Sequence, residues 1–290
     1  MEKIKEINKM IDEKYDVQNF KKNGVAWPYE LELKFNAGEL ENKYFEFQKK
    51  SSKIFKRSLS LKPHILSNFF YKLACDNNIL DKVKEIIGND IYVWSSAFFS
   101  KAPGEGKIVS FHQDNPYWQL TTTKVVTAWI ALTNSNLHSG ALQAVPKSHS
   151  MGLIKKLDVK NPRKSYLKGE KTTPENDLLS YNQNLEDFIK KNPPLTLNLK
   201  PGQFSIHHVN TVHGSGINKS DNYRIGFAIR YVSSDTKHFK ESKDFATHIN
   251  GNTNTYYKNE KAPDEEFNNK AISQYKASMD STGVFGNKKY

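Results

Sequence analysis

The stretch His112-Gln113-Asp114 is followed, about a hundred residues later, by a single histidine in the run Val212-His213-Gly214-Ser215-Gly216. On an extended strand, side chains two residues apart lie on the same face, so His112 and Asp114 can converge on one ion. Two imidazoles and one carboxylate on one side of a metal leave other coordination positions open, as non-haem Fe(II) oxygenases require. We therefore take His112, Asp114 and His213 as candidate iron ligands.

Short strands separated by turn residues make up the part of the chain that carries these ligands. The segment 125–132 reads Val-Val-Thr-Ala-Trp-Ile-Ala-Leu and is typical of a buried strand. Many short strands of this kind favour a mainly β fold with two sheets closed into a barrel over an α/β fold. The other expected strands are 91–94, 97–99, 107–111, 141–145, 195–199, 204–209 and 225–232.

The length of 290 residues is compatible with one domain over 1–290, with helices flanking the barrel. Apolar residues recur at helical spacing over about 1–90, so we expect a helical N-terminal part there. The barrel core then spans about 91–233. Residues 151–194 form a polar insertion over one end of the barrel, either a lid or a solvated excursion. A polar C-terminal extension covers about 234–290, with a weak helical segment around 265–277.

Two features limit the class of protein. The sequence has no run of eighteen apolar residues and its first residues lack the apolar segment of a signal peptide, so we expect a cytoplasmic protein that does not act at a membrane. Cys75 is the only cysteine, which excludes an intrachain disulfide and a zinc site built from several thiolates. A metal in this protein must be held by nitrogen and oxygen ligands.

The net charge of +12 comes from 43 basic and 31 acidic residues. Such an excess is compatible with nucleic acid, an acidic membrane surface or an anionic substrate. Lysines dominate and are spread along the chain among many asparagines, a pattern that an AT-rich genome produces without any binding partner. A nucleic-acid binder would instead need clustered arginines and aromatic platforms. We therefore expect no nucleic-acid partner and keep an anionic small molecule as a candidate.

The run Arg224-Ile225-Gly226-Phe227-Ala228-Ile229-Arg230 alternates in a way that separates two faces of a strand. The isoleucines and the phenylalanine share one face, whereas the arginines share the other with two small residues. Arginines inside a barrel are costly unless anions pair with them. A 2-oxo dicarboxylate meets this need through bidentate contacts. Arg224 is thus a candidate for binding 2-oxoglutarate, and Arg230 is either a substrate ligand or an exposed residue.

Together these segments resemble the phytanoyl-CoA dioxygenase family of Fe(II)- and 2-oxoglutarate-dependent oxygenases, over about residues 91–232. The resemblance implies a double-stranded β-helix (jelly-roll, cupin-like) barrel, with iron, 2-oxoglutarate and O2 as cofactor and cosubstrates. The matching segments are His112-Gln113-Asp114, Thr127-Ala128-Trp129-Ile130-Ala131-Leu132, the segment from Ser139 to His149, and the segment from His213 through Arg224.

Several site residues follow from this resemblance. It implies that His112, Asp114 and His213 bind iron, and that Arg224 and Ser215 hold the distal carboxylate of 2-oxoglutarate. Gln113 and Trp129 match residues that line the same pocket. Tyr117 and Trp118, directly after the metal motif, either line the substrate pocket or pack against the insertion. His207 and His208 alternate on one strand, so at most one faces the metal, and neither occupies a ligand position of the motif.

Two departures from the family pattern bear on the reaction. Family members often have glycine where Lys147 stands. The run Asn115-Pro116-Tyr117-Trp118 and the strand from Arg224 to Arg230 look closer to the branch that includes carrier-dependent aliphatic halogenases. Those halogenases replace the ligand aspartate with a small residue to make room for halide. Because Asp114 is present, the sequence favours hydroxylation.

The expected reaction is hydroxylation of an unactivated C–H bond in a small polar or anionic metabolite, with release of succinate and CO2. One alternative is the same reaction on an acyl or aminoacyl group bound to a carrier protein or to CoA. A second is a barrel that binds a ligand without catalysis, and the complete ligand set with Arg224 argues against it. The motifs do not identify the substrate.

Overall fold

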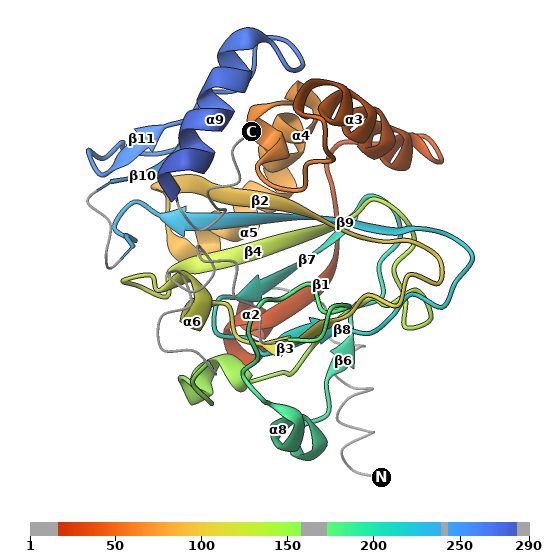
Figure 1. The fold of residues 1–290 in the computed structure, drawn as a ribbon. Helices are drawn as coiled ribbons and strands as arrows, with labels where there is room; N and C mark the ends of the chain where they lie inside the picture. The colour runs from red at the N-terminus through yellow and green to blue at the C-terminus, as the bar shows by residue number, and fades with distance from the viewer. Residues whose placement is uncertain (1–16, 158–172, 239–242, 283–290) are drawn as a thin grey trace.

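The computed structural model describes residues 17–157, 173–238 and 243–282, and Figure 1 shows a β-rich body with helices on its outside. The helices are α2 (Val17–Asn23), α3 (Glu39–Phe55), α4 (Asn68–Ala74), α5 (Asn77–Ile87), α6 (Asn115–Trp118), α8 (Glu186–Lys191) and α9 (Asn269–Thr282), with 3-10 turns η1 (Pro63–Ile65) and η2 (Ser148–Met151). The strands are β1 (Val25–Glu30), β2 (Ile91–Lys101), β3 (Val109–His112), β4 (Val125–Ala131), β5 (Leu142–Ala144), β6 (Leu195–Thr196), β7 (Gln203–His208), β8 (His213–Ser215), β9 (Arg224–Ser233), β10 (Asp244–Asn250) and β11 (Tyr257–Asn259).

The strands form two sheets that enclose the site. The major sheet has seven strands in the order β1-β7-β4-β9-β2-β10-β11, and the minor sheet has four in the order β3-β8-β5-β6. Almost all neighbours are antiparallel, the exception being β10 with β11. Chain-distant strands pair in both sheets, as expected of a jelly roll. The fold is therefore the expected mainly β double-stranded β-helix with flanking helices.

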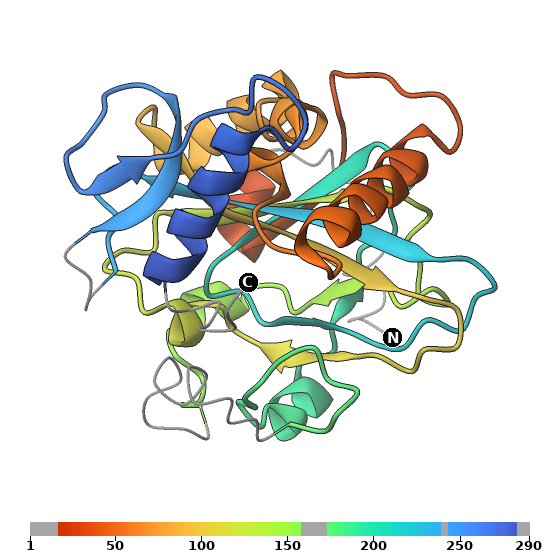
Figure 2. The same cartoon turned by 45° about the horizontal axis from the view of Figure 1, so that its top comes forward.

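Helices cover one face of the major sheet, as the turned view in Figure 2 shows for α3 and α9. A single apolar cluster joins these helices to the sheet, for example Phe47 of α3 and Phe70 of α4 against Phe227 of β9. Their rings meet edge to face, with Phe47 and Phe70 centroids 5.6 Å apart. The outer face of the sheet is thus the hydrophobic core, and the inner face is free for the site.

Strand β9 divides its side chains between these two faces as the sequence predicts. Ile225, Phe227 and Ile229 are fully buried in the core under the helices. Arg224 and Arg230 lie on the opposite face and line a cavity between the two sheets. Because the side-chain period of a strand is two, this alternation fixes the register against both neighbours, β2 and β4.

The structure also departs from the expectations. The N-terminal part is not wholly helical, because Val25–Glu30 form the edge strand β1. The C-terminal extension contributes β10 and β11 as well as its helix, which spans Asn269–Thr282 and so lies a few residues further along the chain than expected. Residues 1–16 of the expected helical part lie outside the described residues, as do residues 158–172 of the insertion. Lys147, where the family often has glycine, adopts a left-handed φ of 65°.

Buried polar contacts attach the C-terminal extension to the rest of the chain. The Lys62 ammonium lies 2.7 Å from the Glu260 carboxylate and 2.9 Å from the Ser278 hydroxyl, and all three side chains are buried. Strand β10 pairs with β2, so the extension also continues the major sheet. Within the described ranges, no helix has the length and apolarity needed to cross a bilayer.

Candidate functional site

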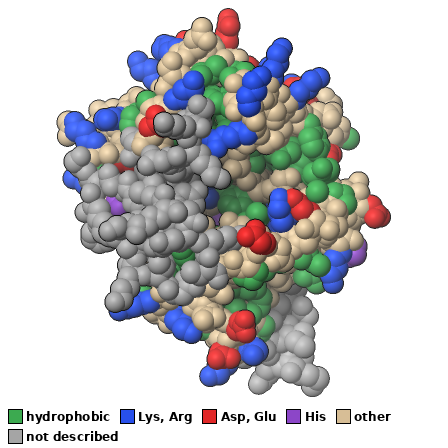
Figure 3. Space-filling model, viewed as in Figure 1, with side chains coloured by type: hydrophobic (Ala, Val, Ile, Leu, Met, Phe, Trp, Pro, Cys, Tyr) green, Lys and Arg blue, Asp and Glu red, His purple; other side chains and the backbone are tan. Residues whose placement is uncertain are grey.

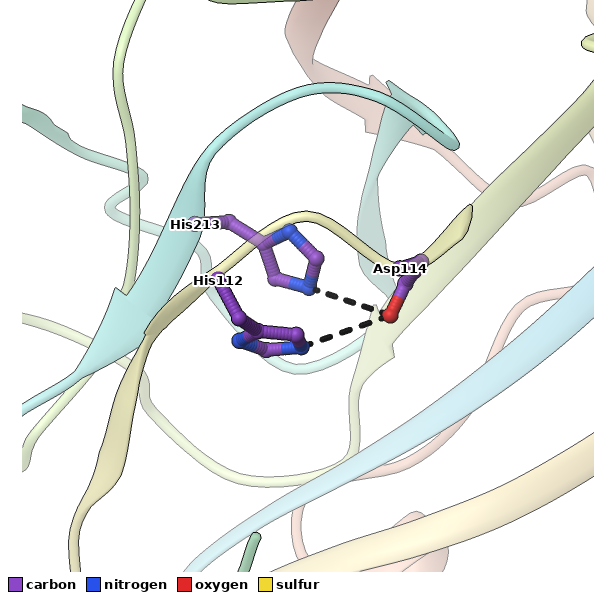
Figure 4. A group of neighbouring side chains, drawn as sticks. All are labelled: His112, Asp114 and His213. Atoms are coloured by element: carbon purple, nitrogen blue, oxygen red, sulfur yellow. Dashed lines mark ion pairs between the residues drawn. The ribbon is translucent and has the colours of Figure 1, made fainter. Parts of the chain in front are cut away.

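His112, Asp114 and His213 come together at the end of the minor sheet (Figure 4). His112 and His213 face each other as a register pair of β3 and β8. Their Nε2 atoms lie 3.3 Å and 3.8 Å from the same carboxylate oxygen of Asp114. All three side chains are buried. The structure thus brings together all three residues that the sequence predicts as ligands.

Backbone contacts orient both imidazoles. Nδ1 of His112 lies 2.8 Å from the Ser110 carbonyl oxygen, and Nδ1 of His213 lies 2.9 Å from that of Thr211. A carbonyl only accepts hydrogen bonds, so each Nδ1 must carry the proton and each Nε2 is left with its lone pair toward Asp114. This is the tautomer that a metal ligand needs, with the second ring nitrogen held by the protein.

The electrostatics of His213 and Asp114 agree with this arrangement. Burial lowers the pKa of His213 to about 4, with a further contribution from His112, so its imidazole is neutral at neutral pH. Burial alone would raise the pKa of Asp114, but its proximity to His213 and His112 holds it below its usual range. Two neutral imidazoles and one carboxylate are the donor set of a divalent metal. The residues present therefore fit iron.

A cavity of about 530 Å³ extends from this cluster between the sheets. Side chains of both sheets line it, together with residues of α3, residues 58–61 and residues 178–181 of the insertion. Segment 58–61 runs along β2, where Phe98 donates a backbone hydrogen bond to Ser60. The described part of the insertion therefore contributes to the lining of the cavity.

Arg224 lies in this cavity with unused hydrogen-bonding capacity. Its side chain is 2% exposed, and Nη1 donates to the Phe99 carbonyl oxygen at 3.2 Å. Its Nε and Nη2 have no hydrogen-bond partner among the described residues. The guanidinium also lies over the Trp129 ring, 5.6 Å from the centroid. A buried cation with two free donors is suited to a carboxylate from a ligand.

Gly226 creates the space that Trp129 occupies. A β-carbon at position 226 would lie 1.8 Å from the Trp129 indole, closer than any two such atoms can approach. Because Gly226 has no side chain, the indole can lie directly against β9 beside Arg224. Trp129 lines the cavity, as the sequence predicts.

Lys101 is a site residue that the sequence reasoning missed. Its ammonium is fully buried and donates to the Ser215 hydroxyl at 2.6 Å and to the Gly216 carbonyl oxygen at 2.5 Å. Lys101 is the register partner of Arg224, and through Ser215 it contacts a residue that lines the cavity. Burial and, to a smaller extent, the nearby Arg224 lower the pKa of Lys101 to about 7. The sequence holds no signal for this role, because Ser215, Gly216 and Arg224 are all more than a hundred residues away along the chain.

Gln113 does not lie in the cavity, where a residue that contacts 2-oxoglutarate would be expected. Its amide donates to the carbonyl oxygens of Gly152 and Asn210 and accepts from the Ile154 backbone. These bonds connect the metal motif to the start of the insertion and to the turn before His213. Gln113 is not among the residues that line the cavity, and we do not retain it as a 2-oxoglutarate ligand.

The residues expected near the substrate all line the cavity. Tyr117 donates a hydrogen bond to the Tyr181 carbonyl oxygen, so it also fastens the insertion. Trp118 lies over Arg230, whose guanidinium carbon is 5.3 Å from the ring centroid. His207, in contrast to His208, faces the metal cluster, with Nε2 4.0 Å from the second Asp114 oxygen.

Comparison with known proteins gives a family match and several relatives. The model of the family "Phytanoyl-CoA dioxygenase (PhyH)" matches residues 18–226. A phytanoyl-CoA dioxygenase of Arabidopsis thaliana is 30% identical over 144 residues, covering 49% of this chain and 45% of its own. An ectoine dioxygenase of Halomonas elongata is 27% identical, covering 60% of this chain and 52% of its own. A probable α-ketoglutarate-dependent hypophosphite dioxygenase of Stutzerimonas stutzeri is 26% identical, covering 67% and 64%.

The matches thus span about half to two thirds of the length of these relatives. Solved structures resemble the fold over more of the chain. The non-haem monooxygenase ThoJ superposes with a TM-score of 0.76 at 20% identity, covering 93% of this chain and 97% of its own. CytC3 with Fe(II) and α-ketoglutarate superposes with a TM-score of 0.57 at 20% identity, covering 87% and 94%. At such identities the likeness shows the fold alone.

Proposed function

Because the chain belongs to the phytanoyl-CoA dioxygenase family, we propose that it is an Fe(II)- and 2-oxoglutarate-dependent dioxygenase that hydroxylates an unactivated C–H bond of a small polar or anionic molecule. The observation that carries this proposal is the coincidence of two features in one cavity. One is the oriented cluster of His112, Asp114 and His213, and the other is the buried Arg224 with two unused donors. The relatives that match the sequence are named dioxygenases.

The protein residues have separable roles in this reaction. His112, Asp114 and His213 would hold iron, with both imidazoles fixed by backbone carbonyls. Arg224 would bind the distal carboxylate of 2-oxoglutarate through Nε and Nη2, and Ser215, held by Lys101, would add a hydroxyl contact. Iron with 2-oxoglutarate and O2 supplies an oxidant for an unactivated carbon, releasing succinate and CO2.

The walls of the cavity contribute by excluding water and restricting the bound molecules. Trp129 covers Arg224, which strengthens charge interactions by lowering the local dielectric. Tyr117 attaches the insertion across the opening. A substrate carbon held beside the metal cluster gains from orientation more than from any acid or base group of the protein. In this proposal the protein contributes by positioning the substrate and by excluding water from the site.

Anaerobic titration with Fe(II) and then with 2-oxoglutarate tests this function. We expect the weak visible charge-transfer band of the chelated cosubstrate, and we expect succinate to form slowly once O2 is admitted. The variant Asp114→Ala should give neither, whereas Arg224→Ala should still bind iron but require far more 2-oxoglutarate. If folded wild-type protein gave no band, a barrel that binds a ligand without catalysis would replace the proposal.

A further inference from the structure

Four polar side chains form a row across the inner face of the major sheet. Ser95 on β2 is the register partner of Arg230 on β9. Arg230 is in turn the register partner of Thr127 on β4, and Thr127 is the register partner of His207 on β7. All four line the cavity. Because register partners on one face stand side by side, these side chains form one continuous polar strip on an otherwise largely aromatic and aliphatic wall.

Every member of this row has a polar atom with no hydrogen-bond partner in the described part of the chain. The atoms are Oγ of Ser95, Oγ1 of Thr127, Nδ1 of His207, and both Nε and Nη1 of Arg230. The first three side chains are at most 3% exposed. Buried polar groups are nearly always paired, so unpaired atoms that all border one cavity indicate a missing ligand.

The charge of the missing ligand follows from Arg230. No carboxylate lies within ion-pair distance of its guanidinium among the described residues, and Asp114 belongs to the metal cluster. Trp118 and Phe99 flank it, with centroids 5.3 Å and 5.8 Å from its guanidinium carbon. Aromatic faces attract a cation but cannot accept hydrogen bonds in its plane. An oxyanion supplies both the charge and the acceptors.

The row is separate from the site assigned to the cosubstrate. Arg224 and Arg230 are six residues apart on one strand, about 20 Å between their α-carbons at the rise of a β-strand. Each guanidinium packs against a different indole, Trp129 for Arg224 and Trp118 for Arg230. The two arginines therefore offer two anion positions in one cavity, and the distal carboxylate of one cosubstrate can fill only one of them.

We propose that the row of Ser95, Arg230, Thr127 and His207 binds an oxyanion of the primary substrate, a carboxylate or a phosphonate. This inference rests on the proposed function, in which Arg224 is occupied by 2-oxoglutarate. Arg230 makes the charged contact through Nε and Nη1, and the two hydroxyls and the imidazole complete it. The charged end of the substrate then lies under Trp118, and its aliphatic part lies in the apolar portion of the cavity.

Binding of simple probes to the anaerobic protein with Fe(II) and 2-oxoglutarate tests the row. The probes are pentanoate and butylphosphonate, with pentanamide as the neutral match for pentanoate. The readout is the perturbation of the visible charge-transfer band. We expect the anions to bind and pentanamide to bind much more weakly. Arg230→Gln should weaken anion binding by at least about tenfold, as for the loss of one charge-assisted hydrogen bond, and change 2-oxoglutarate affinity less than about twofold.

Variants at Thr127, Ser95 and Arg224 test whether the loss of anion binding is specific to this row. Thr127→Val and Ser95→Ala should weaken anion binding in the same direction by a smaller factor, whereas Thr127→Ser should retain it. Arg224→Gln should show the reverse pattern, with weak 2-oxoglutarate binding. An Arg230→Gln protein that lost 2-oxoglutarate affinity as strongly as anion affinity would overturn the proposal, because Arg230 would then serve the cosubstrate. Equal binding of pentanoate and pentanamide would overturn it as well.

A metal-free measurement separates this inference from the proposed function. Pentanoate and butylphosphonate are titrated into the iron-free protein, and the fluorescence of Trp118 is isolated by comparison with Trp118→Phe. A response that disappears in Arg230→Gln supports the row even if wild-type protein forms no complex with iron and 2-oxoglutarate. No response at millimolar probe, in a protein that does form that complex, overturns the row and leaves the proposed function intact.

Discussion

Replacing Arg224 with methionine should weaken cosubstrate binding without destabilising the ligand-free protein. The guanidinium is 2% exposed and two of its three nitrogens have no partner among the described residues, so the folded protein carries an uncompensated buried cation. Replacing buried charge by an apolar side chain of similar volume stabilises by about 1–4 kcal/mol in favourable cases. The lost hydrogen bond to Phe99 offsets about 1 kcal/mol of this. The melting temperature should therefore stay level or rise by a few degrees.

Binding should change in the opposite direction and by more. Two charge-assisted hydrogen bonds to one carboxylate contribute about 1.5–3 kcal/mol each, or about 3–6 kcal/mol together. Their loss corresponds to an approximately 10²- to 10⁴-fold higher dissociation constant for 2-oxoglutarate. In wild-type protein, cosubstrate at a hundred times its dissociation constant should add about 2.7 kcal/mol to the unfolding free energy. The variant should gain almost nothing at the same concentration.

Thermal melts with and without 2-oxoglutarate, in the presence of Zn(II) as a redox-inert metal, measure both effects on one sample. The visible band of the anaerobic iron complex gives the dissociation constant independently. A variant that melted several degrees below wild type without ligand, yet kept wild-type affinity for 2-oxoglutarate, would refute the reasoning. Arg224 would then be a structural residue whose donors are satisfied in another way.

The remaining predictions concern the metal and the cosubstrate pocket. Asp114→Ala should abolish iron binding and turnover, whereas His207→Ala should leave iron binding largely intact; equilibrium dialysis with Fe(II) distinguishes them. Gly226→Ala should displace Trp129 and raise the dissociation constant for 2-oxoglutarate with little effect on iron, as titration of the charge-transfer band would detect. Since burial lowers the pKa of Lys101 to about 7, its charge and the affinity for 2-oxoglutarate should fall as pH rises through 7, and Lys101→Met should lack this dependence. Without ligand, the same lysine makes the free energy of unfolding rise with pH between about 7 and its ordinary value of 10.5, which denaturant titrations at several pH values would detect.

The parts of the site that were predicted correctly follow from the spacing of residues within single strands. His112 and Asp114 share a face because they are two residues apart, and the alternation from Arg224 to Arg230 separates core from cavity within a single strand. The same parity argument allowed only one of His207 and His208 to face the metal, but it could not say which. That choice depends on the pairing of β7 with β4, which is a long-range property.

Strand β1 and residue Lys101 show why other parts could not be predicted. Pro28 interrupts the strand pattern of Val25–Glu30, and it is tolerated only because β1 lies at the edge of the sheet, beside a register shift. Lys101 reads as an ordinary surface lysine at the end of a strand. Its partners at Ser215 and Gly216 are more than a hundred residues away, so its burial becomes visible only after folding.

The structure shows where basic side chains lie on the surface. On the face seen in Figure 3, basic side chains are distributed over the surface and interspersed with acidic ones. A nucleic-acid groove would instead gather them in one stripe. The positive charges that matter to the proposed chemistry are the buried Lys101 and Arg224 and the half-buried Arg230.

The cavity is lined partly by sheet strands and partly by segments outside the sheets, and this affects which substitutions can change the substrate range. The inner wall belongs to sheet strands whose opposite face is the hydrophobic core, so few changes there are free of a folding penalty. The lining outside the sheets comes from α3 and from segments 58–61 and 178–181, and of these α3 and 58–61 also contribute Phe47 and Leu59 to that core. Mutational libraries confined to 178–181 should therefore yield variants with altered substrate range at a high rate, while libraries in the inner wall should yield mostly inactive ones.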